Sequence, residues 1–139
     1  MLVECWRDLL QDGFVRVFMN IHSYTGTGSF EGWLRKIFVN GALEYLRKSD
    51  VLRESTDLDS SADLVQSDSS AIEHLSAAEL MKLIQELPVG FRTVFNMFAI
   101  EGYSHKEISE ALGITESTSR SQFTRARQLL QKRIKELYK

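Results

Sequence analysis

Residues 104–139 read SHKEISEALGITESTSRSQFTRARQLLQKRIKELYK. Ser104 and Glu107 have the spacing of a capping box at the start of a helix, and Gly113 can adopt the positive φ that ends one. Thr115 offers an N-cap for a second, longer helix. A helix, a glycine turn and a second helix in this order predict a helix-turn-helix, a motif that docks on DNA.

The second of these helices has two chemically different faces. An apolar stripe at three- and four-residue steps is predicted to face a small core and contains Phe123, Ala126, Leu130, Ile134 and Leu137. The other face is predicted to carry Arg120, Gln122, Arg125 and Arg127. Residues 115–139 hold 7 basic and 2 acidic residues in a chain whose net charge is −2. The positive charge is therefore concentrated on the helix that would enter a DNA groove.

The composition changes sharply between residues 49 and 76. This segment contains 7 acidic residues, 1 basic residue and many serines, and it has no aromatic residue. Its lack of an apolar period predicts a flexible acidic linker. We therefore expect two small helical domains, at residues 1–48 and 77–139, on either side of it.

The first domain is expected to consist of two amphipathic helices. The apolar face of the first helix contains Leu9, Leu10, Phe14, Val17, Phe18 and Ile21. Residues 23–28, Ser-Tyr-Thr-Gly-Thr-Gly, form a loop, and Ser29 caps the second helix. Gly13 and Gly41 lie inside these helices, where close helix packing is the expected reason for a glycine.

The second domain begins with another capping box, at Ser76 and Glu79, and Pro88 ends its first helix. A further helix is expected to carry Phe91, Val94, Phe95 and Phe98. The helix-turn-helix completes the domain. No segment of the sequence alternates with a period of two residues for long enough to predict a strand, so the chain is expected to be all-α.

Several protein classes are excluded by composition. The single cysteine, Cys5, can form neither an intrachain disulfide nor a thiolate zinc site, and the 3 histidines show no ligand spacing. The sequence has no glycine-rich phosphate loop and no nucleophile with a positioned base. We therefore expect no enzymatic activity, metal, cofactor or small-molecule substrate. No apolar run is long enough for a membrane span, which predicts a cytoplasmic protein without membrane insertion.

Both halves of the chain resemble domains of one protein family. The first half carries Asp8-Leu9-Leu10-Gln11-Asp12-Gly13-Phe14, then Ser29-Phe30-Glu31-Gly32-Trp33-Leu34-Arg35-Lys36-Ile37, Asn40 and Tyr45-Leu46-Arg47. It resembles domain 2 of a bacterial sigma factor of the extracytoplasmic-function (ECF) group in the sigma-70 family. The second half carries Leu87-Pro88, Tyr103-Ser104-His105-Lys106-Glu107-Ile108 and Thr118-Ser119-Arg120-Ser121-Gln122-Phe123-Thr124-Arg125-Ala126-Arg127. It resembles domain 4 of the same group, and the two resemblances cover nearly all of the chain after Trp6.

The resemblance implies a transcription initiation factor whose partners are core RNA polymerase, promoter DNA and an anti-sigma factor. Asp8, Gln11 and Asp12 would dock on the coiled coil of the largest polymerase subunit. The residues expected at the melted minus-ten DNA are Tyr24, Phe30, Trp33, Arg35, Lys36 and Asn40. Those expected at the duplex minus-thirty-five element are Thr118, Arg120, Ser121, Gln122, Arg125 and Arg127. In this second set, Arg120 and Gln122 are expected to discriminate bases, and Arg125 and Arg127 to hold phosphates.

Some positions depart from the family pattern. Family members usually carry a further helix before the position of Asp8, for which the preceding residues here are too few, so we expect domain 2 to lack its first helix. An aliphatic residue is usual at Ser119, and a basic residue is frequent at Gln122. His105 is expected to be an exposed residue in the first turn of its helix.

Two other functions stay open on the residues alone. A free-standing helix-turn-helix regulator would bind operators as a dimer without polymerase. An interaction protein that sequesters polymerase would not bind DNA. The polar side chains of residues 8–12 could also be a solvated helix face, and Tyr24, Phe30 and Trp33 could be core aromatics. The 8–12 pattern together with the run at 29–40 favours the sigma-factor interpretation.

Overall fold

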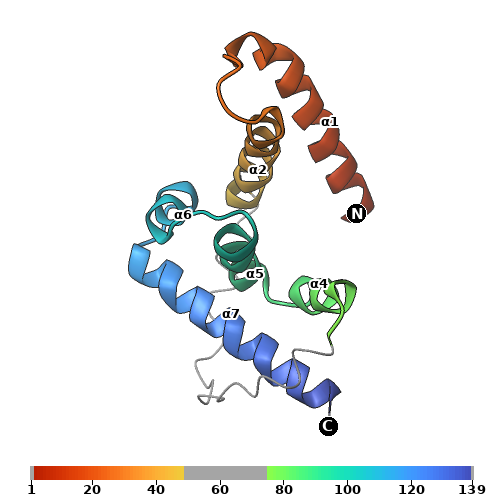
Figure 1. The fold of residues 1–139 in the computed structure, drawn as a ribbon, viewed down its shortest axis with the longest axis vertical. Helices are drawn as coiled ribbons and strands as arrows, with labels where there is room; N and C mark the ends of the chain where they lie inside the picture. The colour runs from red at the N-terminus through yellow and green to blue at the C-terminus, as the bar shows by residue number, and fades with distance from the viewer. Residues whose placement is uncertain (1, 49–74, 139) are drawn as a thin grey trace. The chain divides into compact units, whose positions relative to one another are not determined.

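The computed structural model describes residues 2–48 and 75–138, and the chain divides into two compact units, Met1–Ser49 and Asp50–Lys139 (Figure 1). Every regular element within the described ranges is helical. The predicted all-α class is therefore confirmed. The linker predicted at residues 49–76 lies outside the described residues except for Leu75 and Ser76.

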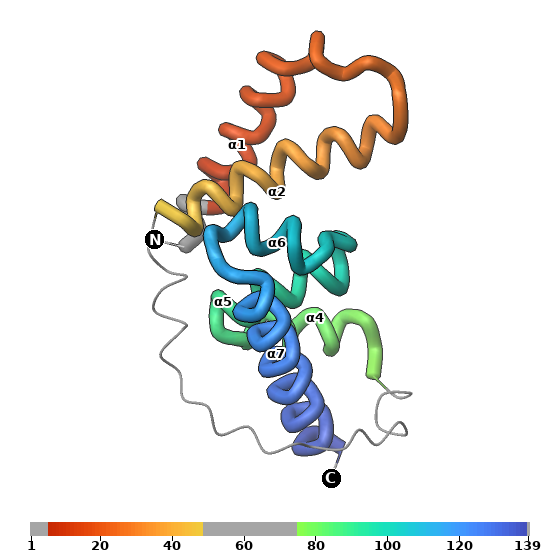
Figure 2. Tube along the Cα trace, turned by 90° about the vertical axis from the view of Figure 1, so that its left-hand side faces the viewer, coloured from red at the N-terminus to blue at the C-terminus, as the bar shows by residue number. Residues whose placement is uncertain are grey.

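Two long helices make up the first unit. They are α1 (Leu2–Asn20) and α2 (Phe30–Lys48), with the 3-10 turn η1 (Ile21–Ser23) after α1. The helices pack against each other and are joined by the loop that follows η1 (Figure 2). Phe14 and Phe38 meet edge to face with their ring centroids 5.2 Å apart. Arg16 Nη2 donates to Glu44 Oε2 at 2.8 Å, so an ion pair also connects the two helices.

The two glycines inside these helices have different surroundings. A β-carbon at Gly13 would overlap the Cε1 and Cδ1 atoms of the Phe38 ring. The expectation that close helix packing explains the glycine is confirmed here. At Gly41 the same expectation is wrong, because no atom other than those of its chain neighbours and of the surrounding helix backbone lies within 4 Å of an added β-carbon. Packing therefore requires only the first of these two glycines.

Glu44 is the acidic centre of a small ion network between the helices. Its carboxylate accepts hydrogen bonds from Lys48 Nζ at 2.9 Å and from Arg16 Nη2 at 2.8 Å. These two bonds lower the pKa of Glu44 from 4.5 to about 2. Because the folded protein holds this negative charge more readily than the unfolded chain, the stabilisation is complete above pH 4.5 and is lost as the pH falls towards 2.

We expect Glu44→Gln to destabilise the first unit at neutral pH, and the difference from wild type to shrink as the pH falls from 4.5 to about 2. Both tryptophans, Trp6 and Trp33, lie in this unit, so tryptophan fluorescence during urea unfolding follows it alone. Glu31→Gln is the matched control, because the Glu31 side chain is 82% exposed and reaches Arg35 only at 3.8 Å. A difference between wild type and Glu44→Gln that stays constant over this pH range would contradict the prediction.

The first unit leaves much of its apolar surface exposed. Phe14 and Phe18, on the predicted apolar face of α1, are 53% and 75% exposed. Val17 and Leu43 are the apolar residues of this unit that are buried in the described part of the chain. Exposed apolar surface that is contiguous along a helix is typical of a binding surface.

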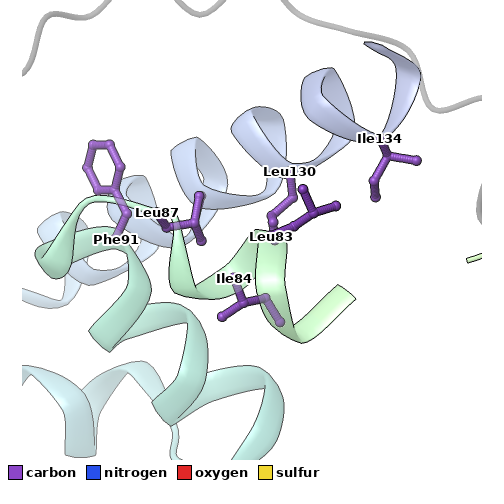
Figure 3. Close-up of a cluster of buried hydrophobic side chains, with 7 residues drawn as sticks. Leu83, Ile84, Leu87, Phe91, Leu130 and Ile134 are labelled. Carbon is purple, nitrogen blue, oxygen red and sulfur yellow. The ribbon is translucent and has the colours of Figure 1, made fainter. Parts of the chain in front are cut away.

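The second unit is built around one long helix. Its elements are α4 (Ala77–Gln85), α5 (Val89–Phe95), the π-helical turn η3 (Asn96–Ile100), α6 (His105–Leu112) and α7 (Glu116–Leu137). Side chains of α7 pack against α4 and α5 (Figure 3). One buried cluster of the core consists of Leu83, Ile84, Leu87, Phe91, Ala126, Leu130 and Ile134. Of the predicted stripe on α7, Ala126, Leu130 and Ile134 are confirmed as buried. Phe123 is only partly buried, and Leu137, the last residue of α7, is 62% exposed.

Hydrogen bonds from side chains fix the helix starts of the second unit. Ser76 and Glu79 form a reciprocal capping box at α4, and Ser104 and Glu107 form one at α6. Both predicted boxes are therefore confirmed. Leu75 is partly buried against the core, so the packed part of this unit includes a residue placed in the linker by its sequence.

Candidate nucleic-acid interface

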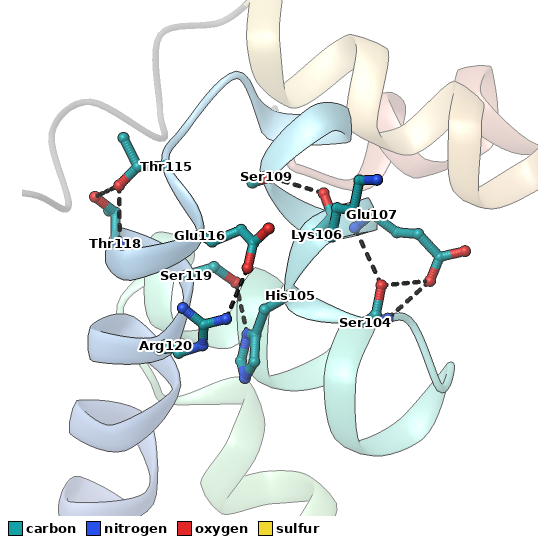
Figure 4. Close-up of polar contacts among 10 residues, drawn as sticks. All are labelled: Ser104, His105, Lys106, Glu107, Ser109, Thr115, Glu116, Thr118, Ser119 and Arg120. Carbon is teal, nitrogen blue, oxygen red and sulfur yellow. Dashed lines mark hydrogen bonds and ion pairs between the residues drawn. The ribbon is translucent and has the colours of Figure 1, made fainter.

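The predicted helix-turn-helix is formed by α6 and α7 (Figure 4). Gly113 has φ 68° and ψ 32°, the left-handed conformation that glycine adopts without strain, and it ends α6. Thr115 then starts α7, where its Oγ1 accepts a hydrogen bond from the Thr118 N–H at 3.1 Å. Ile108 and Leu112 bury the inner face of α6. The turn at Gly113 and the buried side chains of α6 therefore hold the start of α7 at the surface of the second unit.

Three of the predicted duplex contacts lie near this start. Arg120 is exposed, and its Nη2 donates to Glu116 Oε2 at 2.7 Å. Ser121 is exposed and donates its hydroxyl to the Thr118 carbonyl at 3.0 Å. Thr118 is partly exposed and lies on the same helix face as Ser121, three residues away. These side chains are accessible to a nucleic acid.

Gln122 does not lie on the exposed face, and its predicted position is wrong. Its side chain is buried, with 8% exposed. The buried positions of α7 are Ser119, Gln122, Ala126, Leu130 and Ile134, which recur at three- and four-residue steps. Gln122 precedes Ala126 by one helical turn and therefore shares its inward direction. A buried amide cannot read a base edge unless the helix first repacks.

Arg125 and Arg127 extend the basic face of α7. Arg127 is exposed and Arg125 is partly exposed. In the part of the chain that the structure describes, neither guanidinium belongs to an ion pair, whereas Arg133 donates to Glu86 Oε2 at 3.1 Å. Their positive charge is therefore available to phosphate groups.

His105 and Ser119 connect the two helices of the motif. His105 Nδ1 lies 2.9 Å from Ser119 Oγ, and Ser119 is 0% exposed (Figure 4). The imidazole stacks on Phe98 at a centroid distance of 4.4 Å. The expectation of an exposed His105 is wrong, because these contacts leave the residue only partly exposed. The sequence signal for this contact was the serine at a position where the family usually has an aliphatic residue.

The loop of the first unit brings three predicted aromatic residues together. Tyr24 lies 5.3 Å from Phe30 and 5.5 Å from Trp33 between ring centroids, and Phe30 stacks on Trp33 at 5.6 Å. The Tyr24 hydroxyl donates to the Gly28 carbonyl at 3.0 Å. Gly28, with φ 85°, and Gly26, with φ 74°, supply the left-handed conformations of the loop. Phe30 stays 46% exposed, so the cluster presents aromatic surface at the loop.

Polar residues of α2 continue from this aromatic cluster. Lys36 and Asn40 are exposed, and the helical spacing of Trp33, Lys36 and Asn40 places them on one face. Arg35 is also exposed, and it lies 3.8 Å from Glu31. Aromatic surface followed by cationic and amide side chains is a combination that suits single-stranded nucleic acid.

Asp8, Gln11 and Asp12 lie on α1, and all three are exposed. Their i, i+3 and i+4 spacing places them on one helix face. Val17 and Gly13, which are buried, lie on a different side of the helix. The three residues therefore form a compact acidic surface that a partner can reach.

Other kinds of site were not found within residues 2–48 and 75–138. No group of three or more histidine, cysteine, aspartate or glutamate side chains in these ranges could hold a metal ion. None of the helices described is both long and apolar enough to cross a membrane.

Family models match the two units separately. The family described as Sigma-70 region 2 matches residues 6–51, which include α2 and most of α1. The family described as Sigma-70, region 4 matches residues 77–130, which include the helix-turn-helix.

Curated relatives agree with these matches. The chain is 34% identical over 128 residues to the ECF RNA polymerase sigma factor SigE of Mycolicibacterium smegmatis, covering 88% of this chain and 49% of the relative. It is 30% identical over 142 residues to the ECF RNA polymerase sigma-E factor of Haemophilus influenzae, covering 94% of this chain and 75% of the relative. The chain thus spans about half the length of the first relative and three quarters of the second.

A solved structure shows a similar fold. It is the sigma factor RpoE from Bartonella quintana in complex with the anti-sigma factor NepR, and it aligns with a TM-score of 0.54 at 21% identity. The alignment covers 93% of this chain and 80% of that one.

Together, the two helical units, with a helix-turn-helix in the second, carry matches to two regions of sigma-70 proteins and so define the class of a sigma factor. The chain belongs to the ECF group of RNA polymerase sigma factors in the sigma-70 family. The region 2 match on the first unit disfavours the alternative of a free-standing regulator with an unrelated N-terminal module. Sigma factors are non-catalytic transcription factors.

Proposed function

We propose that this chain binds core RNA polymerase through α1 and directs the enzyme to promoters through DNA contacts of both units. The observation that supports the proposal best is the exposed acidic surface of Asp8, Gln11 and Asp12 in a unit that matches sigma region 2. A regulator that acts without polymerase has no need for this surface. The function is regulatory and requires no catalytic group, and we place it in the cytoplasm, where promoter DNA is available.

For the minus-ten DNA we propose that the aromatic cluster of Tyr24, Phe30 and Trp33 contacts unstacked bases. Base stacking on aromatic rings tolerates many sequences and contributes about 1–3 kcal/mol per base. Lys36 and Asn40, on the Trp33 face of α2, then follow the backbone of the same strand. The 46% exposure of Phe30 supports this assignment, because a fully buried ring could not stack on a base.

For the minus-thirty-five DNA we propose that Thr118, Arg120 and Ser121 approach base edges, while Arg125 and Arg127 hold phosphates. The first three lie near the start of α7, the end of a recognition helix that usually meets bases. Arg120 would have to exchange its pairing with Glu116 for a base contact. An anti-sigma factor is the further partner that we propose, since the related RpoE structure contains one.

The proposal is tested by capture of core polymerase. We expect a triple variant with Asp8→Ala, Gln11→Ala and Asp12→Ala to lose co-purification with the core enzyme, because the side chains removed are the proposed contacts. Helical content should not change, since all three side chains are exposed. Circular dichroism checks this, and binding is measured by pull-down of purified core enzyme on the immobilised full chain.

The control for this test makes the same change of charge elsewhere. Glu110→Ala, Gln128→Ala and Glu136→Ala together also remove two carboxylates and one amide, but from α6 and α7. We expect this control to retain the core enzyme. Equal capture by wild type and the α1 variant would overturn the proposed docking surface.

A further inference from the structure

We propose that His105 is a positioning residue for promoter recognition, which acts by holding Ser119 and with it the first turns of α7. The inference rests on the proposed function, namely that α7 binds the minus-thirty-five duplex. The contact depends on the histidine and the serine that occur together in this chain. His105 itself needs no contact with DNA in this arrangement.

The buried hydroxyl group of Ser119 has its hydrogen-bond partner on the other helix of the motif. Ser119 is 0% exposed, and a buried hydroxyl is costly unless it is hydrogen-bonded. Its partner is His105 Nδ1 at 2.9 Å, which comes from the other helix of the motif, 14 residues earlier. The bond therefore spans the turn, and it ties the start of α6 to the start of α7.

The surroundings of the His105 imidazole hold it in place. Ser104 caps α6 immediately before His105, with its hydroxyl accepting the Glu107 N–H at 3.2 Å. The ring stacks on Phe98 with an interplanar angle of 12° and meets Phe123 at a centroid distance of 5.9 Å. His105 therefore holds the start of α7 in one position in the free protein. Such preorganisation lowers the entropic cost of binding DNA.

Ser119 is adjacent in the sequence to the proposed base contacts. Thr118 and Arg120 are its direct neighbours, and Ser121 follows them, so the three proposed base contacts move with it. Base contacts depend on position more strictly than phosphate contacts do, because they discriminate through directed hydrogen bonds. A loosened first turn should therefore reduce discrimination between sequences and leave the count of phosphate contacts unchanged.

The test compares two substitutions of His105 that separate its hydrogen bond from its stacking. His105→Phe keeps an aromatic ring next to Phe98 and loses the polar atom. His105→Asn loses the ring but places a polar atom where Nδ1 was. We expect His105→Phe to weaken binding of the full chain to a matched minus-thirty-five duplex about 5-fold to 10-fold, the effect of one hydrogen bond. His105→Asn should stay within about 2-fold of wild type, and both should be measured by fluorescence anisotropy.

Ser119→Ala tests the same bond from its other end. It removes one oxygen without touching the aromatic stack, so it remains informative if His105→Phe unfolds. We expect it to match His105→Phe in affinity, to reduce the preference for matched over mismatched duplex, and to leave the salt dependence of binding unchanged. The double variant should be no weaker than either single variant, because both lose one shared interaction.

Several results would overturn the proposal. A loss for His105→Asn together with wild-type binding by His105→Phe would mean that stacking, and not the hydrogen bond, is what matters. If the slope of log K against log salt concentration were lower by about one unit for the His105 variants, His105 would contact a phosphate itself. Additive losses in the double variant would mean that the two residues act separately. Failure of the proposed function is distinguishable, because then Arg127→Ala would leave duplex binding and its salt dependence unchanged as well.

Discussion

Replacing Gly13 with alanine is expected to destabilise the first unit, because overpacking a tight contact costs about 1–3 kcal/mol before the helix propensity of alanine is counted. The new β-carbon would overlap the ring of Phe38, which already meets Phe14 edge to face at 5.2 Å. Either that ring must rotate out of its contact or α1 and α2 must separate. The gain that alanine normally brings to a helix interior is about 1 kcal/mol, which only partly offsets this loss.

Gly41→Ala is the matched control, because it makes the same change in the same unit. Apart from its chain neighbours and the surrounding helix backbone, no atom lies within 4 Å of the added β-carbon there, so we expect stabilisation of about 0.5–1 kcal/mol from the helix propensity of alanine. Urea unfolding followed by tryptophan fluorescence measures both variants, since Trp6 and Trp33 report on this unit. If both variants were stabilised, the close contact at Gly13 would not exist in solution.

The same pair of glycines shows what the sequence could predict and what it could not. Both interrupt an amphipathic helical pattern, and nothing local distinguishes Gly13 from Gly41. The difference lies in Phe38, which is 25 positions later in the chain than Gly13 and packs directly against it. No such side chain packs against Gly41. Capping boxes such as Ser104 with Glu107 were predictable because all their partners lie within one helical turn.

The candidate DNA surface was predictable where chemistry and helix geometry agree. Arg127 is charged and exposed, so charge alone placed it correctly. Gln122 is polar, which favours a position at the surface. Its four-residue spacing from Ala126 places it on the inward face of α7, where it is buried. Phe123 is only partly buried, although its apolar side chain favoured the core. Where a polar and an aromatic residue are adjacent in a helix, as Gln122 and Phe123 are, the positions of the neighbouring helices determine which side chain faces the core.

The bond between His105 and Ser119 lay beyond the sequence for a related reason. Each residue alone has an ordinary interpretation, one as a first-turn polar residue and the other as a substitution for an aliphatic side chain. Their interaction depends on the angle at which α6 and α7 meet, which Gly113 and the packing of Ile108 determine. The serine at position 119 therefore has its structural meaning only together with the histidine that it meets across the turn.

The largest effect on DNA binding is expected for the double variant Arg125→Ala and Arg127→Ala. If each arginine holds one phosphate, each loss should lower the salt slope by about 0.9 and weaken binding about 8-fold near 0.1 M salt, or about 60-fold for both. Matched and mismatched duplexes should be affected alike, because phosphates carry no sequence information. A salt titration of the full chain on both duplexes measures the slope and the ratio of affinities.

Arg133→Ala is the control for charge, because Arg133 is paired with Glu86 at 3.1 Å. We expect this substitution to leave the salt slope of binding unchanged. Gln122→Ala is the control for position: its burial predicts lower stability of the second unit with no change in the matched-to-mismatched ratio. A ratio that falls for Gln122→Ala while stability is kept would mean that α7 repacks on DNA and turns this amide outward. An unchanged slope for the arginine variant would remove these two residues from the DNA surface and move the phosphate contacts to other cations of the chain.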